Sequence, residues 1–319
     1  MRKILTILIL VPLLAFSACS KEKNHEVNDF IKAEYQEKKS DLKKEDLKKL
    51  KKDIREKTEE SSTNRNYISV NDDGFSLLNI KGEEKSKMKK DMSKIELIDF
   101  LNNSLFFVEN NTLSKITSLN GELNEEVIMP VSGRVSVRYD KDTLYVSTND
   151  GIFKYENNES QNVLNDLNIE SFAVRDNLIL YKADSFKFYD MSKKELKPTR
   201  VGDLKGNIRI ASGKNSFLVY TDFNNGIALK VNDIGEIEKV KELNGGKLIR
   251  ENESYAYFSK NGQIYKLNKD TLEYEFLVNT DNDASFLAEN TVIKNGRLLL
   301  NDKPIFSVNN KLFLIKGGK

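Results

Sequence analysis

Cysteine and histidine, which often serve as catalytic groups and metal ligands, are scarce in this chain. Cys19 is the only cysteine and His25 the only histidine in 319 residues, and tryptophan is absent. A lone histidine removes most histidine-based metal sites and catalytic triads before any geometry is considered. The Gly-x-Ser-x-Gly motif of a serine nucleophile and a Gly-rich phosphate loop are also missing. We therefore predict no metal site, no cofactor and no catalytic residue.

Carboxylates are the remaining candidates for chemistry, because glycoside hydrolases assemble their acid pair from distant strands. The acidic groups that could suggest a site stand at 71–74, 140–142 and 281–283. Asp281-Asn282-Asp283 is similar to part of a calcium loop, but the full D-x-D-x-D-G pattern and its distant glutamate are missing. Asp and Asn stabilise turns through their own side chains, so we interpret all three groups as turns.

The first eighteen residues have the order of a secretory signal. Arg2 and Lys3 precede thirteen residues, Ile4–Phe16, in which Thr6 is the only polar one, and Ser17 and Ala18 are small. A bilayer requires about 20 apolar residues for one helical span. The shorter stretch suits the core of a cleaved signal peptide.

Phe16-Ser17-Ala18-Cys19 resembles the lipobox of bacterial lipoproteins, although that family usually has leucine at the position of Phe16. The resemblance implies that residues 1–18 are removed and that Cys19 becomes the lipid attachment site, carrying a thioether-linked lipid and palmitate. The acyl chains would anchor the protein to the cell membrane on its extracytoplasmic side. The alternative is an ordinary cleaved signal in which the cysteine stands by chance.

Removal of the signal segment changes the charge balance. The formal charge of +2 includes Arg2 and Lys3, and without them 49 basic residues face 49 acidic ones. A neutral chain has no long-range attraction for phosphate backbones, so we expect no nucleic-acid partner.

Residues 19–61 are predicted to form a charged helical stalk. Residues 19–60 contain thirteen basic and twelve acidic residues, with no Gly and no Pro, and cannot build a core of their own. Acid-to-base pairs at i,i+4 spacing support a helix; they are Glu34–Lys38, Glu45–Lys49 and Asp53–Lys57. The segment is either a partly solvated helix that holds the body away from the membrane or a helix that pairs with a partner or with itself.

From residue 62 the chain consists of short apolar runs separated by Asn, Asp and Gly. Seven runs begin at intervals of 38, 39, 34, 39, 38 and 43 residues. They occupy 67–70, 105–108, 144–147, 178–181, 217–220, 255–258 and 298–300. Turn signals follow them, most clearly Asn149-Asp150-Gly151 and Asn261-Gly262. Such residues tolerate the positive φ of tight turns, so each run predicts a β-hairpin.

A period near 40 residues, with a hairpin and room for a strand on either side, is typical of a β-propeller blade. We predict an all-β propeller over 62–319 with seven blades, six or eight being the alternatives. In the third unit we expect strands at 134–139, 143–148, 151–156 and 161–164. Leu312–Ile315 should supply a strand near the seam of the ring.

By this pattern, and not by any motif, the region resembles the divergent propeller domains of bacterial surface lipoproteins. Neither a Trp-Asp dipeptide nor the tryptophan of quinoprotein repeats is present. A pair of β-sandwiches is the alternative fold.

Together these features predict a membrane-anchored, non-enzymatic propeller that binds or scaffolds an envelope protein or glycan. One alternative is an envelope glycoside hydrolase or lyase with carboxylates at the ring centre. Another is a stalk-mediated assembly or sensor protein. Two carboxylates that face each other in a central pocket, about 5–9 Å apart, would favour the enzyme, whereas a face lined by scattered Lys, Asn and Tyr without such a pair would favour binding.

Overall fold

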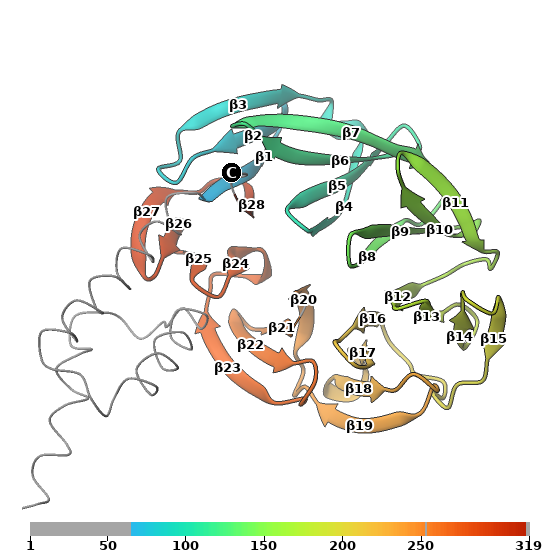
Figure 1. Cartoon of the computed structure of the whole chain (residues 1–319). Helices are drawn as coiled ribbons and strands as arrows, with labels where there is room; N and C mark the ends of the chain where they lie inside the picture. The colour runs from blue at the N-terminus through green and yellow to red at the C-terminus, as the bar shows by residue number, and fades with distance from the viewer. Residues whose placement is uncertain (1–64, 253, 317–319) are drawn as a thin grey trace, which may run out of the picture.

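Seven four-stranded antiparallel sheets form a closed ring, shown in Figure 1. The computed structural model describes residues 65–252 and 254–316. In each sheet, or blade, one strand lies innermost, next to the ring axis, and the other three follow outward (Figure 1). The prediction of an all-β propeller with seven blades is therefore confirmed.

The blades are numbered in chain order, and their strands are given from the axis outward. Blade 1 contains β28 (Lys311–Lys316), β1 (Arg65–Asn71), β2 (Gly74–Leu78) and β3 (Glu84–Lys89). Blade 2 contains β4 (Ile95–Leu101), β5 (Ser104–Glu109), β6 (Thr112–Leu119) and β7 (Glu122–Pro130). Blade 3 contains β8 (Ser136–Asp140), β9 (Thr143–Thr148), β10 (Gly151–Glu156) and β11 (Glu159–Leu164).

The remaining blades follow the same order. Blade 4 contains β12 (Ser171–Arg175), β13 (Leu178–Lys182), β14 (Phe186–Asp190) and β15 (Glu195–Lys197). Blade 5 contains β16 (Ile208–Ser212), β17 (Phe217–Thr221), β18 (Ile227–Val231) and β19 (Ile237–Glu242). Blade 6 contains β20 (Lys247–Glu251), β21 (Tyr255–Lys260), β22 (Gln263–Asn268) and β23 (Tyr274–Asn279). Blade 7 contains β24 (Phe286–Ala288), β25 (Thr291–Lys294), β26 (Arg297–Leu300) and β27 (Lys303–Ser307).

Helical structure in the described part of the chain is limited to single 3-10 turns. They are η1 (Met92–Lys94), η2 (Phe223–Asn225) and η3 (Asp283–Ser285). Over those same residues, 65–252 and 254–316, no helix has the length and apolar character needed to cross a membrane.

The core is divided into seven apolar layers, one between each pair of neighbouring blades. Each second strand supplies the layers on both of its sides. On β5, for example, Leu105 and Phe107 pack toward blade 1, whereas Phe106 packs toward blade 3. Because both faces are covered, a second strand can be buried along its whole length, as β17 is.

The ring is closed by the last described strand. β28 pairs antiparallel with β1, so that Ser69 lies opposite Leu312 and Ile68 opposite Phe313. Phe313 and Ile315 then complete the layer between blades 1 and 2, and the ring of Phe313 stacks on that of Phe100 with centroids 5.3 Å apart. The predicted seam strand is confirmed.

Six of the seven apolar runs are the second strands of their blades, as the hairpin interpretation requires. The seventh was placed one strand too far along, because Leu298–Leu300 belongs to β26, the third strand of blade 7. The second strand is β25, and its sequence Thr291-Val292-Ile293-Lys294 is less apolar than that of β26. Measured from Tyr255 to Thr291, the last interval is 36 residues, so the outlying value of 43 disappears.

The predicted hairpin turns agree with the backbone. Asn261 and Gly262 both have positive φ, at 52° and 73°, and join β21 to β22. At Gly151, where φ is 130°, a Cβ atom would lie 2.1 Å from the carbonyl oxygen of Leu164. Only glycine fits where β10 starts beside β11. The four strands predicted for the third unit match β8 to β11 to within two residues at each end.

Residues 1–64 lie outside the described residues. The signal segment, Cys19, His25 and the charged stalk at 19–61 therefore stay predictions.

Closure by β28 can be tested with Ile315→Ala. Ile315 is 1% exposed in the layer between blades 1 and 2, and truncating such a side chain costs about 2–5 kcal/mol of unfolding free energy. The matched control is Ile237→Ala on the outermost strand β19, where the side chain is 40% exposed. Urea unfolding should show a much larger loss for Ile315→Ala, and equal losses for the two variants would contradict this role of β28.

Candidate functional site

Charged side chains gather at the ring axis. This is the place where the glycoside hydrolase or lyase alternative expects a pair of carboxylates. Five of them stand on innermost strands, and a sixth, Lys269, follows β22 and reaches Glu251. We call this set the axial cluster. It consists of Asp99 on β4, Arg138 on β8, Arg209 on β16, Arg250 and Glu251 on β20, and Lys269.

Contacts between blades that are not neighbours show that these side chains extend over the axis. The guanidinium of Arg250, in blade 6, lies 5.9 Å from the ring centroid of Phe100, in blade 2. Arg138, in blade 3, donates from Nη2 to the carbonyl oxygen of Ile210 in blade 5 at 3.5 Å. Blades far apart in the sequence are thus joined by side chains at the centre of the ring.

Three of the four cations of the axial cluster bind backbone carbonyls of innermost strands. Nε of Arg138 donates to the oxygen of Phe172 at 3.1 Å, and Nη1 of Arg250 donates to that of Leu287 at 2.6 Å. Nζ of Lys269 donates to the oxygen of Ser212 at 3.0 Å. These bonds tie β12, β24 and β16 to side chains from other blades.

Both carboxylates of the axial cluster are paired with cations. Oδ2 of Asp99 lies 3.6 Å from Nη1 of Arg138, and Oε2 of Glu251 accepts a hydrogen bond from Lys269 at 2.8 Å. Burial alone would raise the pKa of Glu251, but the charges of Lys269, Arg138 and Arg209 hold that pKa below its usual range. A glycosidase acid needs a raised pKa to stay protonated, so Glu251 is not placed to act as one.

Arg209 differs from the other cations. It is exposed, and among the described residues no hydrogen bond or ion pair reaches its guanidinium. Partial loss of hydration around the guanidinium, together with the nearby positive charge of Arg138, lowers its pKa. The cluster contains four cations and two carboxylates, so positive charge is left over at the axis.

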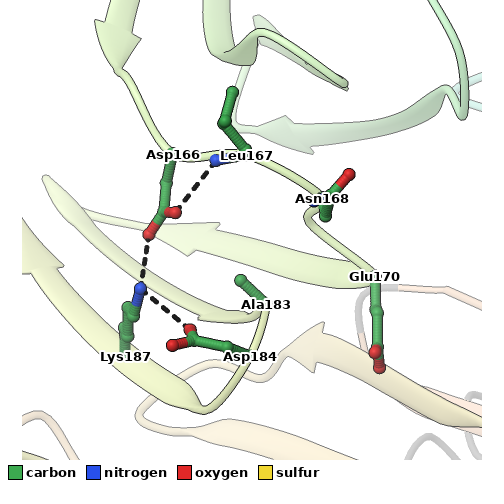
Figure 2. Close-up of a pocket in the computed structure, with 7 residues that line it drawn as sticks. All are labelled: Asp166, Leu167, Asn168, Glu170, Ala183, Asp184 and Lys187. Atoms are coloured by element: carbon green, nitrogen blue, oxygen red, sulfur yellow. Dashed lines mark hydrogen bonds and ion pairs between the residues drawn. The ribbon is translucent and has the colours of Figure 1, made fainter.

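Away from the axis, a hollow of about 310 Å³ lies beside blade 4. Figure 2 shows Lys187 between Asp166 and Asp184, at 2.8 and 3.0 Å from their carboxylate oxygens. Burial would raise the pKa of Asp166, but hydrogen bonds from Lys187 and Tyr181 lower it below the usual value. The charges of Asp166, Asp184 and Lys187 are paired with one another. Among the charged residues that line this hollow, only Glu170 points away from them (Figure 2).

A second hollow, of about 370 Å³, lies where blades 2 and 3 meet. Most of its charges are also paired: Lys115 contacts Glu126 at 3.0 Å, and the hydroxyl of Tyr155 donates to Glu126 at 3.3 Å. Burial raises the pKa of Tyr139 in its wall to about 12. In the described part of the chain, Glu170 in the first hollow and Asp142 in the second are the lining charges that make no ion pair.

The acidic groups seen in the sequence have local roles. The carboxylate of Asp281 accepts hydrogen bonds from the backbone N–H groups of Asn295 and Gly296, at 2.7 and 3.1 Å, and so holds the turn between β25 and β26. The carboxylate of Asp140 accepts from the N–H of Asp176 at 3.0 Å. Within the part of the chain that the structure describes, no three His, Cys, Asp or Glu side chains are placed to hold a metal ion.

Sequence reasoning missed the axial arginines. It named Lys, Asn and Tyr as the side chains of a binding surface, whereas arginine supplies three of the four cations at the axis. A signal was present, because Arg138 and Arg209 stand between apolar neighbours in short strands that precede the apolar runs. A single arginine in such an alternation marks an innermost strand with one side chain directed into a polar centre.

No family model matches this chain, and no curated protein matches it. Among solved structures, it is similar to a quinonprotein alcohol dehydrogenase-like protein from Bacteroides thetaiotaomicron, at 12% identity and a TM-score of 0.49, over 81% of this chain and 79% of that one. The computationally designed protein Ika8 is similar at 13% identity and a TM-score of 0.46, over 78% and 80% of the two chains. An auxiliary nutrient binding protein from the same Bacteroides species is similar at 9% identity and 0.43, over 70% and 65%. At these values the similarities carry no argument about function.

Glu251→Gln should make stability depend on pH in a defined way. The folded pKa of Glu251 is lowered, so its ionised form stabilises the fold above the ordinary value near 4.3, and this contribution is lost as the pH falls through the lower folded value. At pH 7 the variant leaves Lys269 buried without its partner, at a cost of roughly 3–5 kcal/mol.

The measurement is the unfolding free energy of wild type and Glu251→Gln between pH 3 and pH 7. The difference between them should be largest at pH 7 and should shrink below about pH 4. Glu159→Gln, at an exposed position of β11, is the control and should change stability by less than about 0.5 kcal/mol. A difference that stays constant over the whole range would rule out the Glu251–Lys269 pair as its source.

Proposed function

We propose that this protein is a lipid-anchored extracytoplasmic protein whose propeller binds an envelope protein or glycan without catalysing a reaction on it. The axial cluster is the observation that carries the binding part of the proposal. Side chains from four blades gather there, each carboxylate is neutralised by a cation, and one arginine has no partner among the described residues. Such an arrangement suits the recognition of a ligand better than proton transfer to one.

The anchor is supported by the sequence Phe16-Ser17-Ala18-Cys19 and its likeness to a lipobox. The predicted stalk at 19–61 would separate the ring from the membrane, since a helix of that length rises roughly 65 Å. A tether of this kind would keep the ring near envelope ligands while its loops stay accessible.

The anchor can be tested with Cys19→Ala. In cells fed a palmitate analogue, the wild-type protein should be labelled and recovered in the membrane fraction, because the lipid is attached through the thiol of residue 19. Cys19→Ala should be unlabelled, and Ser20→Ala, which leaves the thiol in place, should behave as wild type. Label retained by Cys19→Ala would disprove attachment at this residue.

Binding can be tested by capture from the envelope of the source organism with the detergent-solubilised mature protein as bait. A variant that lacks residues 25–58 should capture the same ligand, because the proposal places the binding surface on the propeller. Loss of capture in this variant would instead favour the stalk as the contact. Cleavage of a captured glycan would favour the hydrolase or lyase.

A further inference from the structure

Three of the four cations in the axial cluster have a structural role, because they bind backbone groups of the innermost strands. The fourth cation has no such role. An innermost strand has no neighbour on its axial side, so some of its backbone groups need side-chain partners there. Arg138, Arg250 and Lys269 donate to carbonyls of this kind. Arg209 donates to none among the described residues, although arginine carries five N–H donors.

The position of Arg209 is nevertheless fixed by the buried strand residues on either side of it. It is exposed between Ile208 and Ile210, both of which are buried in the layer between blades 4 and 5. Arg138 bonds to the carbonyl oxygen of Ile210 at 3.5 Å, so a second guanidinium lies beside the backbone that carries Arg209. The positive charges of Arg138 and Arg209 therefore lie close together, and the nearby carboxylate of Asp99 is already paired with Arg138.

A third arginine adds to this charge. Every blade has four antiparallel strands, so all innermost strands begin on the same face of the ring. Arg209 is the second residue of β16, and Arg134 precedes β8 by two residues, which places both toward this face. Burial and the charges of Arg138 and Arg134 lower the pKa of Arg209, more than Asp99 and Glu251 offset.

We propose that Arg209 is a recognition site for an oxyanion, that is, a carboxylate, phosphate or sulfate group carried by the ligand, and that the positive charges of Arg138 and Arg134 add to its attraction for the anion. The inference rests on the proposed binding function and names the chemistry of its ligand. A guanidinium offers two parallel N–H groups that match two oxygens of such an anion.

The first experiment is isothermal titration of the detergent-solubilised mature protein with inorganic phosphate at low ionic strength. Saturable binding is expected for wild type. Arg209→Gln should weaken it about tenfold or more, because the variant removes charge-assisted hydrogen bonds. Arg200→Gln is the matched control, since Arg200 is 79% exposed and pairs with Glu236 instead, and it should bind as wild type.

A stability measurement separates loss of the site from loss of the fold. The side chain of Arg209 makes no hydrogen bond to the described chain and its charge is repelled by that of Arg138, so Arg209→Gln should unfold at the same urea concentration as wild type or at a higher one. An unfolding midpoint as low as that of Ile315→Ala, with phosphate binding lost, would show that Arg209 supports the fold, and would overturn the proposal.

The second experiment asks what carries the anion. A short oligomer of a uronic acid is compared with a neutral oligosaccharide of the same length, on wild type and on Arg209→Gln. Binding of the acidic oligomer to wild type alone supports a carboxylate on a glycan, whereas binding of phosphate alone supports a phosphate group. Equal binding of the neutral oligosaccharide, or no saturable binding of either anion, would overturn the inference. If envelope capture persisted in that last case, the proposed function would stand without it.

Discussion

Apolar side chains of neighbouring blades pack against each other in seven layers, and each layer takes residues from both of the blades that it joins. A single blade would expose two apolar faces, so stability depends on completing the circle. The chain completes it by pairing β28 with β1, which places the first and last described strands in one blade. Every other feature, including the position of the axial side chains, follows from this closure.

The same constraint explains which strands the sequence revealed. Second strands are covered on both faces, so they appear as mostly apolar runs, and six of the seven runs were assigned correctly for that reason. Blade 7 departs from the rule, because its second strand begins with a buried threonine and ends with an exposed lysine. Its third strand, Arg297-Leu298-Leu299-Leu300, is more apolar and was chosen instead. The wrong strand assignment is confined to blade 7, and the predicted number of blades is correct.

The candidate site was far less visible, and the reason is geometric. Asp99 and Arg250 influence each other although 150 residues separate them, because closure brings blades 2 and 6 to the same axis. Nothing in the local sequence of either strand indicates this meeting. What the sequence does contain is the isolated arginine within an apolar strand, as in Ile208-Arg209-Ile210. That pattern has a physical meaning only once the strand is known to be innermost.

Closure also accounts for the sign of the axial charge. The axial edges of innermost strands present carbonyl oxygens that no further strand can pair, and a carboxylate, which only accepts hydrogen bonds, cannot satisfy them. Arginine and lysine can, and Phe172, Leu287 and Ser212 each receive such a bond. A ring built this way therefore gathers cations at its centre even though the basic and acidic residues of the whole chain balance after the signal segment is set aside. Asp99 and Glu251 neutralise part of that charge. Because Arg209 satisfies no carbonyl and meets no free carboxylate in the described chain, the needs of the fold do not explain it, whereas an incoming oxyanion would.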